Sequence, residues 1–196
     1  MRHMKKKIYL AQHNWRGTDP NYERLIYLQA EDEVIIKGNI PIDDEGLVVE
    51  LSAISFTVAF GQDFPEDAQS LVECNVVDFI LPAWREYRTP QEWALKILEL
   101  RPKLIVEDTG DLQEKFVNIL SEHPLYGTHW FYVFKVNNSP EIVRKLPNEL
   151  LLGFNSDGMH AYTFDWKPVE LFPYADIYRW GGTASQFSLI IWDSKA

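Results

Sequence analysis

Few side chains in this sequence have the types and spacing that catalysis or metal binding requires. His13, His123, His129 and His160 are scattered, and no two of them stand at the spacing of metal ligands. Cys74 is the only cysteine and has no histidine nearby to activate its thiol. Phosphate-binding and nucleophile-elbow motifs are absent from the sequence. We therefore expect no catalytic residue, no metal site and no cofactor.

The carboxylates are numerous, but they are expected in loops and on helix faces. An acid–base pair needs two carboxylates in contrasting environments, and the sequence alone brings no such pair together. An enzyme with an unrecognised site stays open as an alternative. A deep pocket that holds a buried histidine or two close carboxylates would support it.

The charge is strongly acidic and unevenly distributed. Twenty-nine Asp and Glu against 19 Lys and Arg give a formal net charge of −10, and no Lys or Arg lies between Lys37 and Arg85. Such a surface repels nucleic acid and anionic lipid, so neither is an expected partner. We interpret it as a solvated acidic face. The alternative is a docking patch for a basic partner, centred on Asp43, Asp44 and Glu45, whose affinity would fall with salt.

Cysteine usage and hydropathy favour a cytosolic protein. A lone Cys74 allows no internal disulfide, and no apolar run approaches the roughly 18–20 residues of a membrane helix. We interpret the sequon Asn137-Asn138-Ser139 as a turn, and the first four residues as a cloning remnant.

Between Pro20 and Glu122 the apolar residues recur at helical spacing, and four helices are expected. The strongest local signal is Thr89-Pro90-Gln91-Glu92, where Thr89 caps a helix and Glu92 completes a capping box. The other three helices are expected to begin at Asp19, near Asp43 and at Asp111. Residues 62–75 are expected to form a long acidic loop, and 76–81 a short apolar run. Four such helices predict a compact bundle.

After a seam at 125–128 the apolar residues fall into short runs typical of strands. Gly127 is interpreted as a tight helix-to-strand turn, with a flexible joint as the alternative. Asn155 to Gly158 is expected to form a hairpin turn. The five expected strands form an antiparallel meander and cover 130–136, 150–154, 159–164, 175–180 and 186–193.

The last of these strands is apolar on both faces. Phe187, Leu189 and Ile191 point one way, whereas Ile190 and Trp192 point the other. Its outer edge is expected to be open, and open apolar edges favour pairing with another chain. Self-association through this edge is therefore an expected possibility.

Several short motifs, in this order along the chain, resemble the FERM domain. Three segments resemble its helical second lobe: residues 25–30 together with 38–41, residues 50–61, and Phe79-Ile80-Leu81-Pro82. The junction into its third lobe is matched by Leu125-Tyr126-Gly127, and the strands of that lobe by 151–155 with Gly158 and by Ile177-Tyr178-Arg179-Trp180.

The resemblance implies an α+β fold in two lobes. Residues 19–125 would form a four-helix bundle like acyl-CoA-binding protein, and 126–196 an antiparallel PH/PTB-like β-lobe. Residues 1–18 would hold the tag remnant and, in 5–10, the last strand of a missing ubiquitin-like lobe. The third lobe of the family has seven strands and a closing C-terminal helix, and this sequence is expected to stop after the fifth strand.

The resemblance also implies a non-catalytic adaptor for cargo or cytoplasmic-tail peptides and cytoskeletal proteins, with weak or no lipid binding. We expect it in the cytoplasm, at the cytoskeleton or the membrane cortex. The tails of unconventional myosins are favoured over the talin type and the plant kinesin type. A surface that autoinhibits a motor is a further alternative.

Peptide ligands of the family often lie between the fifth strand and the closing helix of the third lobe. Carried over to this sequence, with strand addition as the expected binding mode, the candidate peptide site consists of Ser185, Gln186, Phe187, Ser188, Leu189, Ile190, Ile191 and Trp192.

Overall fold

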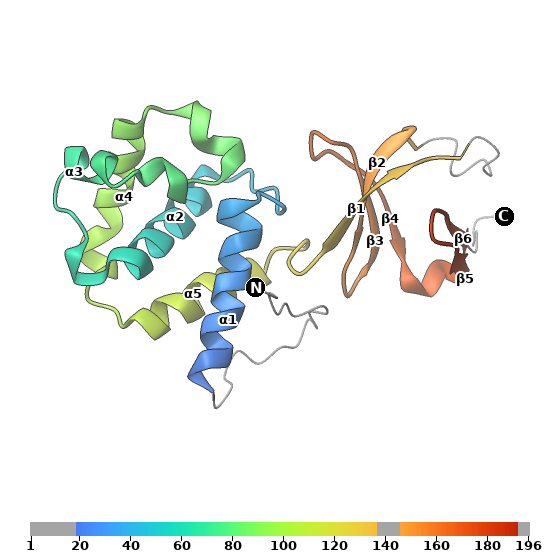
Figure 1. Cartoon of the computed structure of the whole chain (residues 1–196), viewed down its shortest axis with the longest axis horizontal. Helices are drawn as coiled ribbons and strands as arrows, with labels where there is room; N and C mark the ends of the chain where they lie inside the picture. Colours follow the sequence, from blue (N-terminus) through green and yellow to red (C-terminus); the bar gives the residue numbers. More distant parts are fainter. Residues whose placement is uncertain (1–18, 137–145, 192–196) are drawn as a thin grey trace. The chain divides into compact units, whose positions relative to one another are not determined.

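The computed structural model describes residues 19–136 and 146–191 (Figure 1). The chain forms two compact units that part between Tyr126 and Gly127. We call residues 19–126 the helical lobe and 127–191 the β-lobe. The expected strand over 5–10, the sequon at 137–139 and Trp192 lie outside the described residues.

The helical lobe contains a chain of helices joined by short turns. Helix α1 continues without a break into one π-helical turn, Asp32–Ile36. Three 3-10 segments occupy Gly61–Asp63, Val76–Phe79 and Pro82–Tyr87. The α-helices are α1 (Pro20–Glu31), α2 (Glu45–Phe60), α3 (Ala68–Glu73), α4 (Pro90–Leu104) and α5 (Thr109–Ser121).

The predicted helix starts follow from capping chemistry. The Asp19 carboxylate accepts a hydrogen bond from the Asn21 amide at 2.9 Å, with Pro20 in the first position of α1. The capping box at α4 is confirmed: Thr89 Oγ1 accepts from the Glu92 amide, and Glu92 Oε2 accepts from the Thr89 amide at 2.8 Å.

Helix α2 is the centre of the helical lobe. It is buried on almost every side through its middle, as expected of an apolar helix that other helices surround. Trp93 of α4 and Phe116 of α5 are fully buried in the same cluster, and the rings of Tyr27 and Phe116 meet edge to face at 5.2 Å. This single core holds α1, α4 and α5 around α2.

Two details of the helical prediction were wrong. The expected acidic loop over 62–75 contains helix α3, which Asp67 caps and whose Leu71 is fully buried. Asp111 does not cap the last helix, because Asp108 accepts from the Gly110 amide at 2.8 Å and α5 begins at Thr109. Helix α3 makes five α-helices in the described part of the lobe, where four were expected.

The β-lobe consists of a four-stranded antiparallel sheet and a separate two-stranded ribbon. The sheet has the order β1-β2-β3-β4, so the predicted meander is correct for these strands. The ribbon pairs β5 with β6. The strands are β1 (His129–Phe134), β2 (Glu149–Phe154), β3 (Gly158–Tyr162), β4 (Pro168–Pro173), β5 (Ile177–Gly182) and β6 (Phe187–Ile191).

The predicted count of five strands was wrong, because β4 was missed. Proline at both ends of β4 is typical of a turn, but proline is tolerated at the start of a strand and on an edge strand. The strand expected over 186–193 is therefore the sixth, and the fifth is Ile177–Gly182. The β3 strand also ends at Tyr162, two residues before the predicted limit.

The predicted hairpin turn between β2 and β3 is confirmed, and its first residue organises it. The Asn155 amide donates to the Gly158 carbonyl at 3.2 Å. The Asn155 side chain accepts from the Asp157 amide, lies 3.0 Å from His160 Nε2 and donates to Thr128 Oγ1. One side chain thus joins the turn, β3 and the residue that precedes β1.

The two faces of the four-stranded sheet differ. One face carries the small buried cluster of the lobe, made of Leu150, Met159, Ala161 and Phe172, and the ribbon packs on it. The register places Trp130, Tyr132 and Phe134 on the opposite face. There they meet other aromatic rings: Trp130 lies 5.0 Å from Trp166 and 5.4 Å from Tyr162, and Tyr132 lies 5.0 Å from Phe164.

Candidate functional site

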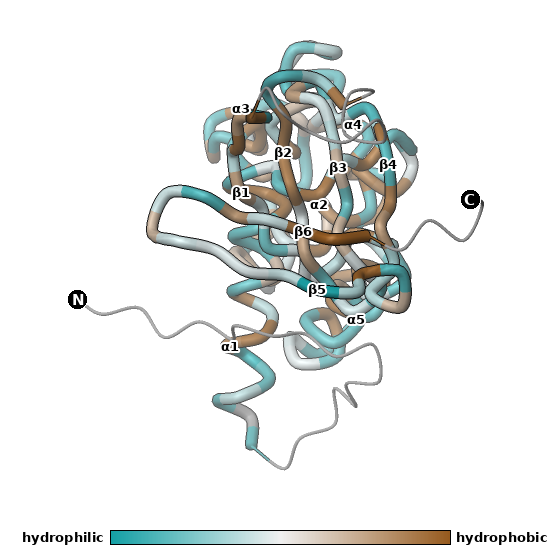
Figure 2. The backbone as a smooth tube through the Cα atoms, turned by 90° about the vertical axis from the view of Figure 1, so that its right-hand side faces the viewer, coloured by the Kyte–Doolittle hydropathy of each residue, from teal (hydrophilic) through white to brown (hydrophobic). Residues whose placement is uncertain are grey.

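The candidate peptide site lies on the β5–β6 ribbon. Ser185 and Gln186 belong to the turn before β6, where the Thr183 amide donates to the Gln186 carbonyl at 2.8 Å. Phe187 to Ile191 form β6. The structure thus brings the described candidates together in one continuous segment, which Figure 2 shows as a hydrophobic strand beside a paler β5.

The predicted alternation of side chains along β6 is confirmed for the described residues. Leu189 and Ile191 pack against the buried cluster of the β-lobe, and the Phe187 ring meets that of Phe154 at 5.9 Å. Ile190 points away and is 55% exposed. The inward residues hold the strand on the sheet, while the outward residue stays available.

Backbone groups of β6 point to its outer edge at every second residue. Residues of an antiparallel pair alternate between hydrogen-bonded and non-hydrogen-bonded positions. Counted from the Thr183–Gln186 bond, Phe187 and Leu189 fall at non-hydrogen-bonded positions opposite Gly182 and Trp180. Their amides and carbonyls therefore face outward, and within the described residues β6 pairs with no strand except β5.

Strand β5 carries two large exposed aromatic side chains. Tyr178 is 73% exposed and Trp180 is 72% exposed, although Trp180 shares a face with the inward Leu189. The register shifts between Ile177 and Arg179, which marks a bulge at Tyr178. The sequence showed these two rings only as part of a family motif and gave no sign of their exposure.

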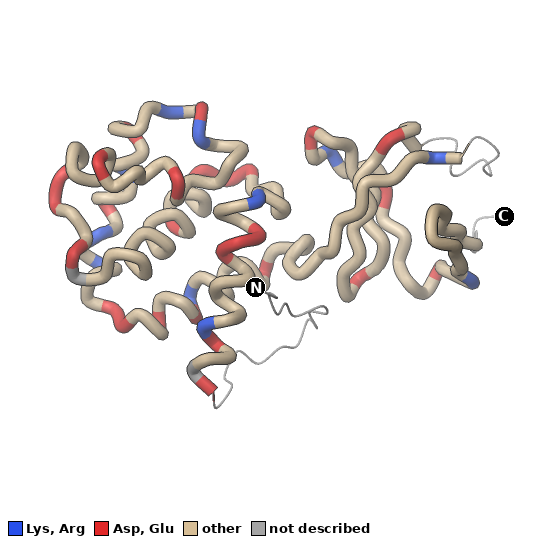
Figure 3. The backbone as a smooth tube through the Cα atoms, in the orientation of Figure 1, with Lys and Arg blue, Asp and Glu red and all other residues tan. Residues whose placement is uncertain are grey.

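The three residues of the alternative acidic patch have different roles. Asp44 caps α2 by accepting from the Gly46 and Leu47 amides. Glu45 binds both Arg88 and Lys96, at 2.8 and 2.9 Å, and hydrogen bonds from Arg88 and then Lys96 hold the pKa of Glu45 down to about 2. Asp43 remains as an exposed charge. Figure 3 shows the many other acidic residues of the helical lobe.

The histidines do not gather with other ligands. His123 is partly buried and His160 is buried, and burial lowers the pKa of each below its ordinary value. Among the described residues no group of three or more His, Cys, Asp or Glu side chains is arranged to hold a metal ion. Within the same part of the chain, no helix is both long and apolar enough to cross a membrane.

Comparison with known families identifies the helical lobe. The FERM central domain family matches residues 16–131, which is more than half of the chain. The chain belongs to the FERM family.

Solved FERM structures share the fold of both lobes. The C-terminal MyTH4-FERM domain of human myosin 7b, solved in complex with the harmonin-a PDZ3 domain, matches 94% of this chain at 18% identity with a TM-score of 0.73. The MF2 domain of Dictyostelium discoideum myosin VII matches 87% at 19% identity and a TM-score of 0.68. The FERM domain of Drosophila Merlin, in complex with its C-terminal domain, matches 97% at 16% identity and a TM-score of 0.63.

A curated relative links the chain to a plant kinesin. A kinesin-like protein of rice, KIN-14I, is 29% identical over 159 residues, which cover 80% of this chain and 12% of that protein. The two myosin structures are matched over 36% and 33% of their length. This chain thus corresponds to a small part of each of these relatives.

Proposed function

We propose that this chain is a non-catalytic protein-interaction module that binds a cargo or cytoplasmic-tail peptide by strand addition to the β5–β6 ribbon and links it to the cytoskeleton. The observation that carries the proposal is the edge of β6. Phe187 and Leu189 direct backbone groups to an edge that no other described strand covers. Backbone hydrogen bonds to such an edge supply affinity, and side chains such as Ile190 supply selectivity.

The inward anchors of β6 favour this mode of binding. Strand addition needs an edge that is already extended, since ordering a free segment costs about 1–2 kcal/mol per residue. Leu189 and Ile191 pack on the buried cluster and hold β6 in place before any partner arrives. The harmonin complex of myosin 7b is consistent with a protein partner for this family, although that partner belongs to the myosin.

The fifth strand supplies a second candidate edge. Ligands of the family often lie along the fifth strand of the third lobe, and that strand is β5 in this structure. The exposed rings of Tyr178 and Trp180 lie on it. A peptide added there would meet the outward backbone groups of Trp180 and Gly182 in place of those of β6.

Amide hydrogen exchange, followed by NMR, tests the proposal without a mutation. In the free chain the amides of Ser188 and Ile190, bonded to β5, are expected to exchange more slowly than those of Phe187 and Leu189. A bound tail peptide, selected from an array of cytoplasmic tails, should then protect Phe187 and Leu189.

The same experiment separates the two edges. Protection of Trp180 and Gly182, in place of Phe187 and Leu189, would move the site to β5. A peptide that binds without slowing exchange on either strand would overturn strand addition.

A further inference from the structure

We propose a second docking site, on the helical lobe, for a basic amphipathic helix of a protein partner. It lies in a groove of about 660 Å³ between α2 and α5, which sequence analysis did not identify as a site. This site goes beyond the proposed function, because it uses neither β5 nor β6.

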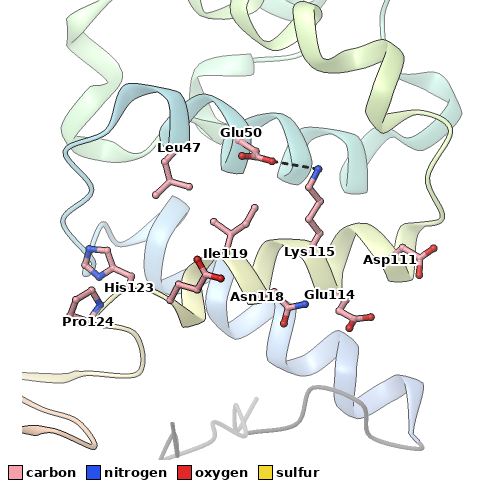
Figure 4. A pocket seen from close by; sticks show the side chains of 10 residues that line it. Leu47, Glu50, Asp111, Glu114, Lys115, Asn118, Ile119, His123 and Pro124 are labelled. Carbon is pink, nitrogen blue, oxygen red and sulfur yellow. Dashed lines mark ion pairs between the residues drawn. The ribbon is translucent and has the colours of Figure 1, made fainter. Parts of the chain in front are cut away.

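The floor of the groove is apolar. Leu47 of α2 and Ile119 of α5 are partly buried, pack against the main core and line the groove. Figure 4 shows Ile119 and Lys115 pointing from α5 toward α2, with Leu47 and Glu50 on the facing side. Pro124 and His123 complete one end. An apolar anchor of a partner would therefore be removed from water on this floor.

The rim of the groove is acidic and largely unneutralised. Glu50, Asp111, Glu114 and Glu122 line it together with one cation, Lys115. Lys115 Nζ lies 3.4 Å from Glu50 Oε1, so this lysine already forms an ion pair. Within the described part of the chain, Asp111, Glu114 and Glu122 form no ion pair. Three carboxylates around an apolar floor match Lys and Arg side chains that flank an apolar stripe.

A neighbouring hollow shows that this excess of acidic side chains is local. That hollow, of about 500 Å³, is lined by Glu45, Glu50 and Glu99 and by an equal number of lysines, namely Lys96, Lys103 and Lys115. Two of its acids are paired, Glu45 with Lys96 and Glu50 with Lys115. The α2–α5 groove has the same kinds of walls but a net excess of three negative charges, so a cationic partner would favour it.

The length of the groove suits a helical occupant. Asp111, Glu114 and Ile119 line one face of α5, Glu122 follows at the C-cap, and the helical rise from the first to the last is about 16 Å. A partner helix of about three turns spans this length. Its anchors at i, i+4 and i+7 would lie on the floor while its cations meet the rim.

Fluorescence anisotropy with a labelled synthetic helix tests the proposal. The probe is an amphipathic peptide of about three turns, with leucines on one face and lysines elsewhere. The whole chain is expected to bind it with an affinity that falls as salt rises. A peptide of the same composition with scrambled leucines should bind less than the probe, since charge alone would not distinguish the two.

Matched variants locate the site. Asp111→Asn, Glu114→Gln and Glu122→Gln together should weaken binding about tenfold, because each exposed ion pair is worth a factor of about two or more. The control variant Asp63→Asn, Asp78→Asn and Glu86→Gln removes the same charge from exposed positions outside the groove and should change affinity less than about twofold. Equal effects of the two variants, equal binding of the scrambled peptide, or no binding of the probe would each overturn the proposal.

Discussion

The two lobes of this chain are stabilised to different extents by buried apolar residues. The main cluster of the helical lobe contains 26 buried residues, whereas that of the β-lobe contains four. Exposed large apolar side chains show the opposite distribution: 11 of the 17 in the described residues belong to the β-lobe. The lobe with the smaller core thus leaves more apolar surface to water.

Charge separates the lobes as well. Residues 19–126 carry 22 Asp and Glu against eight Lys and Arg, whereas residues 127–196 carry seven against six. A strongly acidic surface favours basic partners and steers them over a distance, while a nearly neutral apolar edge selects by fit and backbone pairing. The two proposed binding surfaces therefore differ in chemistry, one being acidic and the other nearly neutral and apolar.

Replacing a tryptophan in each lobe is expected to give the largest difference in stability between the lobes. Trp93→Ala removes a fully buried ring from the helical core and should destabilise that lobe by about 3–5 kcal/mol. Trp180→Ala removes a ring that is 72% exposed and should change the unfolding free energy of the β-lobe by less than about 0.5 kcal/mol. Urea unfolding, followed by spectroscopic signals of the helices and of the side chains, measures the unfolding free energy of both variants. Similar losses of stability in the two variants would contradict the difference in core size between the lobes.

A smaller effect is expected within the β-lobe from two glycines. A Cβ on Gly153 would lie 2.5 Å from Thr128 Cγ2 and 2.6 Å from Trp130 Cζ3, so Gly153→Ala should cost about 1–3 kcal/mol. On Gly181 a Cβ meets no heavy atom within 4 Å, and Gly181→Ala should be nearly neutral. Thermal unfolding compares the two variants. Equal melting temperatures would show that the Trp130 ring moves aside easily.

The smallest expected effect is a pH dependence shared by the two lobes. Burial lowers the pKa of His123 and of His160, against partial opposition from Asp43 and Asp157 respectively. Protonation is therefore disfavoured in the folded chain, and the unfolded chain binds more protons below a pH of about 6.5. Stability should be complete above that pH and fall as the pH drops toward the folded pKa values.

NMR titration of the imidazole signals should give midpoints below 6.5 for both histidines. His123→Gln should reduce the loss of stability between neutral and mildly acidic pH for the helical lobe, and His160→Gln should do so for the β-lobe. A midpoint at or above the ordinary histidine value would contradict the burial of that ring.

Local chemistry made much of the fold predictable. The capping box at Thr89 and Glu92 and the turn at Asn155 depend on residues close in sequence, and both are confirmed. Helix α3 was missed because only Leu71 of its six residues is fully buried and its segment is polar. Strand β4 was missed because Pro168 and Pro173 indicate a turn when no neighbouring strand is known.

The proposed binding surfaces were harder to predict than the elements that carry them. The alternation along β6 is visible in Phe187, Leu189 and Ile190, since it is a property of one strand. The groove between α2 and α5 joins Leu47 to Ile119, which are distant in sequence, and only the packing of the bundle brings them together. Glu45 was grouped with Asp43 and Asp44 in the alternative acidic patch because its partners Arg88 and Lys96 are equally remote in sequence.

The prolines of β4 have a consequence for aggregation. Strand β4 forms one border of the four-stranded sheet, and Pro168 and Pro173 stand at its two ends without amide donors. A foreign strand approaching this border would find an interrupted row of donors, which disfavours the stacking that begins a fibril. Neither β5 nor β6 contains a proline. The distribution of this one residue type thus disfavours stacking at the β4 border of the sheet and leaves the ribbon without such protection.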